Sequence, residues 1–376
     1  MRKRGRAFII GIGIMMAAAA LSGCGKKAEE TAVTTEAETE TPEETKTIVL
    51  ETEPTTEAET EPEGPEERKE VDGKIQSYLT GEMVDVAKAN RRPVAVMMSN
   101  DKASLPQYGI NRADVVYEAP VEGDMNRYMA IFEDYDDIER IGSVRSCRTY
   151  YTYFAREYDA IYAHYGQSTF AVPYLKSVDN INGVDGTGGN AFYRTKDKKA
   201  PHNAYTSGAK LNKTIGQLGY RTSYSDTYTG HFQFSKNAYV PAESDAKDAY
   251  KFYPSYTMNN PWFEYHEDDG LYYRFQYGGP HMGNEGQIAV KNLIIQYCPA
   301  AYYASTEYRN INVQADTWGY YISNGQAEDI TCEKDGEFGV THYYDASGNE
   351  IVLNPGKTWI CICTTNDMQP AKIEGK

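Results

Sequence analysis

The chain has 376 residues, a formal net charge of −16 at pH 7, and 33 tyrosines against 11 phenylalanines. This length is enough for two domains once the N-terminal region is set aside. The net acidity and the lack of a basic stripe argue against nucleic-acid binding. Tyrosine is common both in β-sheets and on wet or carbohydrate-facing surfaces, and we favour the sheet interpretation.

Residues 1–23 have the pattern of a secretory signal. A basic start is followed by the apolar run from Ala7 to Leu21, and the segment leads into L-S-G-C. Small residues before a cysteine at this point resemble a bacterial lipobox, in which the cysteine is lipidated and becomes the new N-terminus. We predict a lipoprotein signal peptide over 1–23, lipidation at Cys24, and a location on the outer face of the cell membrane. An ordinary secretory signal with an incidental cysteine is the alternative.

Residues 24–79 have the composition of a spacer. Between residues 28 and 72 there are 17 acidic and 3 basic residues, together with many threonines and prolines. Such a segment has too few bulky apolar side chains to order itself, and its like charges extend it. We predict a disordered acidic linker that holds the folded part away from the membrane, rather than an acidic recognition segment.

Residues 80–225 alternate between strand and helix patterns, which predicts an N-terminal α/β-type domain with a mixed sheet. Ser143 or Ser146 is a candidate cap for the first of the helices. The predicted strands are 92–100, 115–122, 127–133, 138–144 and 159–165, and the predicted helices are 146–157, 168–178 with a bend at Pro173, and 207–218.

Residues 226–376 are dominated by strand patterns. Hairpin patterns occur over 262–277, 317–332 and 341–353, and apolar runs over 287–297 and 357–363 predict further strands. No period marks a repeat array. We therefore predict a β-rich C-terminal domain, so that the folded part as a whole is α+β, or α/β.

Five cysteines follow Cys24. Their odd number leaves at least one thiol free or paired between chains, and the sequence leaves the pairing open. The C-x-C near the C-terminus would point both sulfurs to one face of a strand, but no His or second Cys pair is close to it in sequence. We predict no metal site and no cofactor. The five are Cys147, Cys298, Cys332, Cys361 and Cys363.

Several ordered motifs connect the chain to a known family. The first half contains R-P-V-A-V-M-M-S-N, E-G-D-M-N-R-Y-M-A-I-F, I-G-S-V-R-S-C-R, H-Y-G-Q-S and A-P-H-N-A-Y-T; the second contains K-N-L-I-I-Q, D-A-S-G-N-E and L-N-P-G-K-T-W-I. In these motifs the chain resembles the YerB-like lipoproteins of Gram-positive bacteria, a two-domain family of unestablished function. The family pattern usually has a small Ala where this chain has Cys147, which favours an inert packing role for that thiol. The resemblance implies a location and a domain layout, but no chemistry.

Arg145 and Arg148 are the strongest candidates for ligand binding. They are three residues apart where a strand passes into a helix, so both side chains are expected on one side of its first turn. Helix N-terminal amides favour an anion, and guanidinium groups offer paired donors to phosphate or carboxylate. Two cations here oppose the helix dipole, so either a bound anion or acidic partners must offset them. An internal arginine–carboxylate network is equally compatible with the sequence. The candidate supporting carboxylates are Asp114, Glu118 and Glu122.

Five further polar residues complete the predicted ligand site. His164 ends an apolar strand, and Gly166 after it would let the backbone approach a ligand. A single strand-end histidine is more often a structural residue, and that alternative stays open. Together with the arginines, these side chains predict a focused positive pocket in an acidic domain. The five are His164, Ser168, Arg194, His202 and Asn203.

These features favour a binding protein over an enzyme. No G-x-S-x-G, H-E-x-x-H, phosphate-binding glycine loop or dinucleotide fingerprint occurs, and no catalytic residue can be assigned. We expect a lipid-anchored extracytoplasmic lipoprotein that binds an anionic or glycan component of the cell envelope or assists envelope assembly, with an envelope protein as a candidate partner. The alternatives are an envelope glycan or phosphoryl transferase or hydrolase that uses the same pocket, and a structural protein-interaction module without a small-molecule site.

Overall fold

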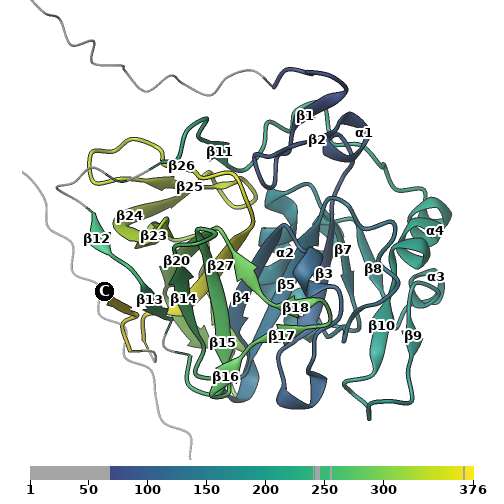
Figure 1. Cartoon of the computed structure of the whole chain (residues 1–376). Helices are drawn as coiled ribbons and strands as arrows, with labels where there is room; N and C mark the ends of the chain where they lie inside the picture. The colour runs from purple at the N-terminus through teal and green to yellow at the C-terminus, as the bar shows by residue number, and fades with distance from the viewer. Residues whose placement is uncertain (1–67, 240, 242–245, 255, 367–368) are drawn as a thin grey trace, which may run out of the picture. The chain divides into compact units, whose positions relative to one another are not determined.

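Two strands far apart in sequence form the junction of the fold. β4 (Val115–Pro120) pairs in parallel with β27 (Thr358–Thr364). In Figure 1 these strands lie side by side, with the other blue and teal strands of the same sheet on one side and its green strands from the second half of the chain on the other. Both halves of the chain therefore contribute to one 11-stranded sheet.

The computed structural model describes residues 68–239, 241, 246–254, 256–366 and 369–376. The predicted signal peptide, Cys24 and linker residues 24–67 lie outside the described residues. The fold begins before the predicted boundary at residue 80, because β1 (Lys74–Gln76) pairs with β2 (Met83–Asp85) and Leu79 is fully buried. The sequence I-Q-S-Y-L contains bulky apolar side chains, which are scarce in the acidic sequence before it.

The large sheet is mixed. β20, β27 and β4 are parallel to one another, as are β3, β7 and β8, and the other neighbouring pairs are antiparallel. β25 (Thr341–Tyr344) pairs with β24 beside this path. The order is β12 (Lys247–Asp248), β24 (Gln326–Lys334), β23 (Thr317–Ser323), β20 (Asn292–Cys298), β27, β4, β5 (Asn126–Phe132), β3 (Val94–Ser99), β7 (Ile161–His164) and β8 (Asn180–Asn182).

Smaller sheets and short helices complete the described part of the chain. A six-stranded sheet contains β16 (Gly279–Pro280), β15 (Leu271–Gln276), β14 (Trp262–His266), β13 (Lys251–Tyr253) and β28 (Lys372–Glu374), with β19 (Ala289–Val290) beside β15. The smaller sheets are β6 (Ile141–Gly142), β10 (Ala204–Thr206) and β9 (Tyr193–Arg194); β11 (Gln233–Phe234) and β26 (Val352–Leu353); β17 (Met282–Gly283) and β18 (Gly286–Gln287); and β21 (Ala300–Tyr302) and β22 (Arg309–Ile311). The α-helices are α1 (Val86–Ala89), α2 (Thr149–Glu157), α3 (Gly186–Gly189) and α4 (Gly208–Leu218), and the 3-10 helices are η1 (Lys102–Ser104), η2 (Ile110–Arg112), η3 (Glu122–Asp124), η4 (Thr169–Ala171) and η5 (Tyr174–Ser177).

Both faces of the large sheet are covered. Along β3, Val96 and Met98 enter one core cluster while Ala95 and Met97 enter another, as the two-residue period of a strand requires. The first cluster includes residues of α4 and the six-stranded sheet, and the second includes residues of α2. Burial on both faces explains why the central strands have nearly continuous apolar sequences. Mixed sheets with few, short helices confirm the predicted α+β class.

The helix after the arginine motif starts later than predicted. α2 begins at Thr149 with Arg148 as its N-cap, and neither Ser143 nor Ser146 caps it. Residues up to Cys147 remain extended because Cys147 N donates to Gly166 O at 2.9 Å, within a β-bridge to the next strand end. This bridge uses backbone groups that a longer helix would need.

Two other predicted elements are shorter than expected. The helix predicted over 168–178 is divided into η4 and η5. Pro173 lies between them, and proline has no N–H to continue a helical ladder. The strand predicted over 138–144 is reduced to β6, which pairs with β10 rather than with the large sheet.

The buried carboxylate of Glu118 links the two halves of the chain through hydrogen bonds. Glu118, on β4, is fully buried and accepts two hydrogen bonds from Arg274 Nη2, at 3.0 and 2.9 Å. Trp359 Nε1 on β27 donates to Glu118 Oε2 at 3.1 Å, and Asn126 Nδ2 donates to Oε1 at 2.9 Å. Glu118 was predicted to support Arg145 and Arg148, and this is wrong, because its carboxylate pairs with an arginine 156 residues away in sequence.

We expect Glu118→Ala to lower the free energy of unfolding by about 3–5 kcal/mol, because it leaves Arg274 charged and unpaired in the interior. Urea denaturation followed by tryptophan fluorescence measures the change. Asp329→Ala, which breaks an exposed pair with Lys247, is the control and should cost less than about 1 kcal/mol. Replacing both buried partners, Glu118→Leu with Arg274→Met, should destabilise less than Glu118→Ala alone; equal or greater loss would contradict this account.

Candidate anion-binding site

The candidate site lies where two parallel strands separate. β3 and β7 pair over three residues each, and beyond this point residues 143–147 run between them. Arg145 N donates to Met97 O at 2.9 Å on one side, and Tyr165 N donates to Arg145 O at 2.9 Å on the other. The segment is therefore at the carboxyl ends of parallel strands, which is where open sheets of α and β structure commonly bind ligands.

Three arginines lie together beside this segment, and we call Arg127, Arg145 and Arg148 the arginine cluster. Arg148 Nη2 donates to Glu122 Oε2 at 2.6 Å, and its Nε bonds the other oxygen of that carboxylate. Arg127 Nη2 lies 3.9 Å from Glu122 Oε2, and its Nη1 donates to Ser146 O at 2.6 Å. Arg145 is half-buried, and its Nη1 is buried with no hydrogen-bond partner in the described part of the chain.

The cluster carries more positive charge than its bonded carboxylate neutralises. Burial, together with the charges of Arg148 and Arg145, lowers the pKa of Arg127 to about 10. Burial and the charge of Arg148 also lower the pKa of Arg145, against smaller opposing effects of Asp101 and Glu122. A lowered guanidinium pKa means that the surroundings disfavour the cation. An anion that accepts hydrogen bonds from the cluster would relieve this repulsion.

Two residues with unpaired side-chain polar atoms, Asn100 and Ser143, belong to the backbone segments next to Arg145. Asn100 directly follows β3, and Ser99 N donates to Ser143 O at 2.9 Å, which places Asn100 and Ser143 at the same strand end. Among the described residues, Ser143 Oγ and both side-chain polar atoms of Asn100 are buried without a hydrogen-bond partner. Each such group costs about 1–3 kcal/mol when it is left unpaired. Donors and acceptors gathered in this way are what a polar ligand site requires.

His202 belongs to the same neighbourhood. Its Nε2 lies 3.8 Å from Asp101 Oδ1, and its Nδ1 is buried without a partner in the part of the chain that the structure describes. Burial lowers the pKa of His202, the charge of Arg145 adds to this effect, and Asp101 opposes it. The structure thus brings Arg145 and His202 together from segments that the sequence separates by more than 50 residues.

His164 and Ser168 are less available to a ligand. The ring nitrogens of the fully buried His164 lie 2.8 Å from Gly166 O and 3.2 Å from Asn180 Oδ1, and burial lowers its pKa. These contacts hold the turn after β7, in keeping with the structural alternative for this histidine. Ser168 is buried, and its N donates to Cys147 O at 3.1 Å.

Arg194 and Asn203 pair with each other at the rim of this region. Arg194 Nη1 donates to Asn203 Oδ1 at 2.6 Å, and its guanidinium lies 4.8 Å from the centre of the Tyr165 ring. Asn203 Nδ2 donates to Thr195 O at 3.1 Å. Because Arg194 is exposed and already has an uncharged partner, it adds little to the unbalanced charge around Arg145.

The sequence-based prediction missed Arg127, Asn100 and Ser143. Arg127 is buried in β5, within the otherwise apolar run R-Y-M-A-I-F, and a cation in such a run was a signal for the site. Asn100 and Ser143 gave no comparable signal, because only the pairing of segment 143–147 with β3 brings them together.

Cys147 does not have the properties of a nucleophile. It is fully buried, and burial raises the pKa of its thiol to about 12. A reactive cysteine is partly exposed and has a lowered pKa. The packing role favoured by the sequence agrees with this environment.

Comparison with known proteins identifies the family. The N-terminal domain of DUF3048, described as a protein of unknown function, matches residues 79–221, and the DUF3048 C-terminal domain matches residues 252–360. The chain is 30% identical over 308 residues to "Putative lipoprotein YerB" of Bacillus subtilis (strain 168), across 80% of this chain and 89% of that protein. The chain belongs to the YerB (DUF3048) family. The crystal structure of YerB from Bacillus subtilis matches with a TM-score of 0.70 and 28% identity, across 80% of this chain and 99% of that one.

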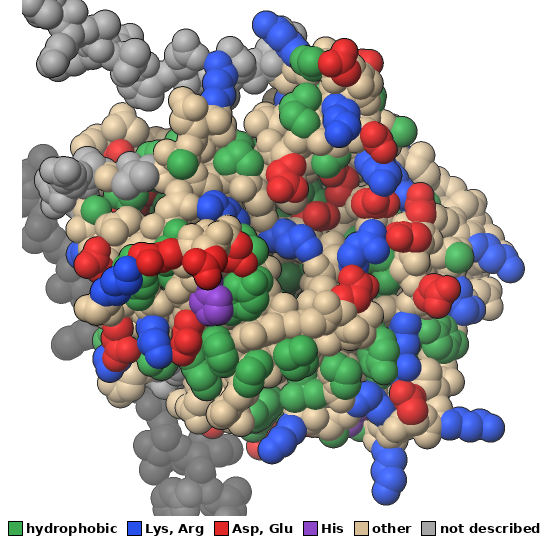
Figure 2. Space-filling view, viewed as in Figure 1, with side chains coloured by type: hydrophobic (Ala, Val, Ile, Leu, Met, Phe, Trp, Pro, Cys, Tyr) green, Lys and Arg blue, Asp and Glu red, His purple; other side chains and the backbone are tan. Residues whose placement is uncertain are grey.

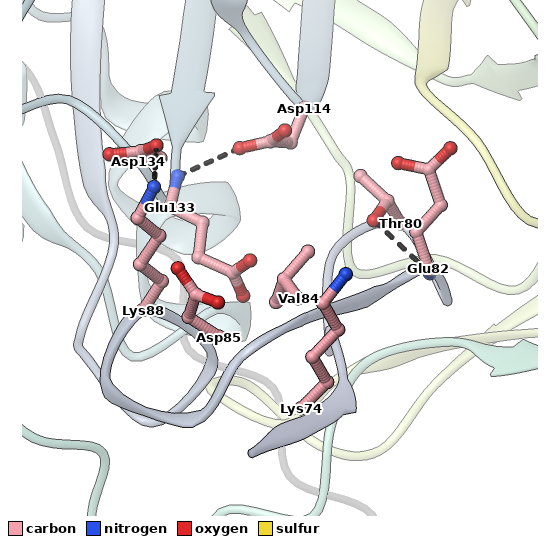
Figure 3. A pocket seen from close by; sticks show the side chains of 9 residues that line it. All are labelled: Lys74, Thr80, Glu82, Val84, Asp85, Lys88, Asp114, Glu133 and Asp134. Carbon is pink, nitrogen blue, oxygen red and sulfur yellow. Dashed lines mark hydrogen bonds and ion pairs between the residues drawn. The ribbon is translucent and has the colours of Figure 1, made fainter. Parts of the chain in front are cut away.

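The fold of this DUF3048 protein also contains an acidic cavity of about 270 Å³. Figure 2 shows red acidic side chains gathered with blue basic ones beside the β1–β2 hairpin, and Figure 3 shows the side chains that line the cavity. Asp114, predicted to support the arginines, lies here instead, where its Oδ2 accepts a hydrogen bond from Glu133 N at 2.8 Å. The lining residues are Lys74, Thr80, Glu82, Val84, Asp85, Lys88, Asp114, Glu133 and Asp134.

Two carboxyls of the acidic cavity take up a proton more readily than an exposed carboxyl does. Burial raises the pKa of Asp114 to about 6, and burial together with the charge of Asp114 raises the pKa of Glu133 to about 7. Ser77 Oγ donates to Glu133 Oε1 at 3.0 Å. No group of three or more His, Cys, Asp or Glu side chains among the described residues is arranged to hold a metal ion.

None of the helices in the described ranges is long and apolar enough to cross a membrane.

We expect Glu133→Gln to remove part of the pH dependence of stability. The folded pKa of Glu133 lies above its ordinary value, so its contribution is fully present below about pH 4 and is lost as the pH rises toward 7. The variant should therefore be more stable than the wild type at pH 8, by about 1–3 kcal/mol, with the difference vanishing near pH 4. Thermal and urea denaturation between pH 4 and 8 measure this. Glu139→Gln, which changes an exposed carboxyl, is the control. If stability changes with pH in the same way in Glu133→Gln and in the wild type, Glu133 does not have a raised pKa in the folded protein.

Proposed function

We propose that this protein is a lipid-anchored, extracytoplasmic binding protein that holds an anionic component of the cell envelope at the arginine cluster. One observation carries the proposal: among the described residues, Arg127 and Arg148 both contact the carboxylate of Glu122, while the third guanidinium of the cluster, that of Arg145, has an unpaired buried nitrogen. An arginine network that only braced the fold would be expected to contain matching carboxylates. Here two of the three predicted carboxylates are used elsewhere, Glu118 with Arg274 and Asp114 with the backbone of Glu133.

The surroundings of the cluster suit a ligand that also carries hydroxyl or amide groups. Asn100 offers both a donor and an acceptor, Ser143 offers a hydroxyl, and His202 offers a ring nitrogen. Guanidinium groups match the geometry of phosphate and carboxylate oxygens. The proposed ligand therefore carries a phosphate or carboxylate with hydroxyl or amide groups close to it.

The proposed location rests on the N-terminal sequence and on the relative. The apolar run that leads into L-S-G-C has the order of a lipoprotein signal, and Cys24 would carry the lipid. The similar protein from Bacillus subtilis bears the name of a lipoprotein. The acidic segment that follows Cys24 would hold the folded part at a distance from the membrane surface.

We expect Arg145→Met to weaken anion binding at least tenfold without destabilising the fold. It removes a charge-assisted donor from the ligand and also removes a cation that the surroundings disfavour. Calorimetric titration of the detergent-solubilised full chain with inorganic phosphate and with poly(glycerol phosphate) measures the affinity, and urea denaturation measures the stability. Lys213→Met, which removes an exposed cation on α4, is the control and should alter neither. A strongly destabilised Arg145→Met variant with unchanged affinity would favour the structural interaction module.

Replacing Cys24 by Ser should release the protein from the membrane fraction, because no sulfur would remain to carry the lipid. Detergent phase partitioning and cell fractionation measure this. Cys147→Ser is the matched control and should leave the protein with the membrane, since that thiol is buried in the fold. Retention of the Cys24→Ser protein in the membrane fraction would count against the proposed anchor.

A further inference from the structure

An aromatic surface lies directly beside the arginine cluster. It consists of Phe170 on η4 and of Tyr302, Tyr303 and Tyr308 in the β21–β22 hairpin. The rings of Phe170 and Tyr303 stack with centres 3.8 Å apart, and the ring of Tyr308 meets Phe170 edge-on at 5.8 Å. The guanidinium of Arg148 lies 5.1 Å from the centre of the Tyr308 ring. The aromatic surface therefore adjoins the arginine cluster through Tyr308 and Arg148.

The hairpin reaches this position from the other half of the chain. Arg309 Nε donates to Val121 O at 3.2 Å, and Arg309 Nη2 lies 3.2 Å from Asp124 Oδ1. Tyr303 Oη donates to Thr149 Oγ1 at 3.2 Å, at the start of α2. The hairpin is thus fixed to the elements that carry Arg148 and Glu122.

The outer part of this surface is open to solvent. Tyr302 is 55% exposed, and the guanidinium of Arg309 lies 5.0 Å from the centre of its ring. Phe170, Tyr303 and Tyr308 are half-buried. One exposed and three half-buried rings, three of them with hydroxyl groups, lie beside charged donors and suit a ligand with apolar faces and many hydroxyl groups. An acyl chain would instead require an enclosed aliphatic lining, which these tyrosines do not provide.

We propose that the aromatic surface binds sugar rings that flank the charged group held by the arginine cluster, so that the ligand is an anionic glycan. This inference rests on the anion site proposed above, and it adds the ligand class. The pyranose rings would pack on the aromatic faces while the phosphate or carboxylate accepts hydrogen bonds from the guanidinium groups. Both halves of the chain would then be needed for one glycan site.

The test compares an anion alone with the same type of anion on sugars. The detergent-solubilised full chain is titrated with inorganic phosphate, and its binding is measured on an array of phosphorylated, uronic-acid and neutral oligosaccharides together with acidic peptides. We expect at least one anionic oligosaccharide to bind about tenfold more tightly than phosphate. The phosphorylated and uronic-acid members distinguish the two sources of negative charge.

Two variants separate the aromatic surface from the anion site. Tyr302→Ala and Phe170→Ala should each weaken binding of the oligosaccharide about tenfold while leaving phosphate affinity unchanged, whereas Arg145→Met should weaken both. Trp318→Ala is the matched control, because Trp318 is 47% exposed and lies on β23, outside this surface. Near-ultraviolet circular dichroism establishes that each variant keeps its fold.

The outcomes separate the two proposals. If the wild type binds phosphate but no oligosaccharide more tightly, or if Tyr302→Ala and Phe170→Ala bind the oligosaccharide as the wild type does, the glycan inference is overturned and the anion site remains. Tighter binding of an acidic peptide than of any oligosaccharide also overturns it. Absence of phosphate and oligosaccharide binding in the wild type overturns the anion site itself.

Discussion

The parallel pairing of β4 with β27 is the constraint on which the rest of the structure depends. It joins the strands of the first half of the chain to those of the second, and it places Glu118 where Arg274, Trp359 and Asn126 all donate to its carboxylate. A carboxylate is tolerated in such an interior only when its oxygens are fully bonded. Because the Trp359 donor is 241 residues from Glu118 in sequence, the interior of the first half is complete only when the end of the chain has been added.

The balance of charge distinguishes this structural pair from the candidate binding site. At Glu118 one carboxylate meets one guanidinium and two neutral donors, so no charge remains to be compensated. In the arginine cluster, Arg127 and Arg148 contact the Glu122 carboxylate, and Arg145 Nη1 has no hydrogen-bond partner among the described residues. The acidic cavity has an excess of negative charge, but a carboxylate can lose its charge by binding a proton. Burial favours this for Asp114 and Glu133, because it raises the pKa of both. A guanidinium has no such route, since it stays protonated in proteins. An excess of buried arginine is therefore a stronger indication of a ligand than an excess of buried carboxylate.

The geometry of the sheet explains why the cluster forms where it does. β3 and β7 separate after a short parallel pairing, and the backbone of residues 143–147 occupies the space between them. This arrangement uses the main-chain hydrogen bonds of the segment and brings Ser143 and Arg145 to the strand end that Asn100 follows. The β21–β22 hairpin adds aromatic rings from the second half of the chain. The candidate site is thus a property of the shared sheet rather than of either half alone.

Features that depend on neighbouring residues could be predicted from the sequence. Strands such as β3 and β5, the α+β class and the family were predictable, because periodicity, composition and short motifs are local. The tertiary structure decided which charges meet. Glu118 pairs with Arg274 and not with the arginine motif, Asp114 lines a separate cavity, and buried Arg127 joins the cluster. The position at which α2 begins also depends on tertiary structure, because Cys147 forms a β-bridge with the turn after β7. The physical reason is the same in each case: partners of buried polar groups are set by which strands become neighbours, and sequence spacing does not encode that directly.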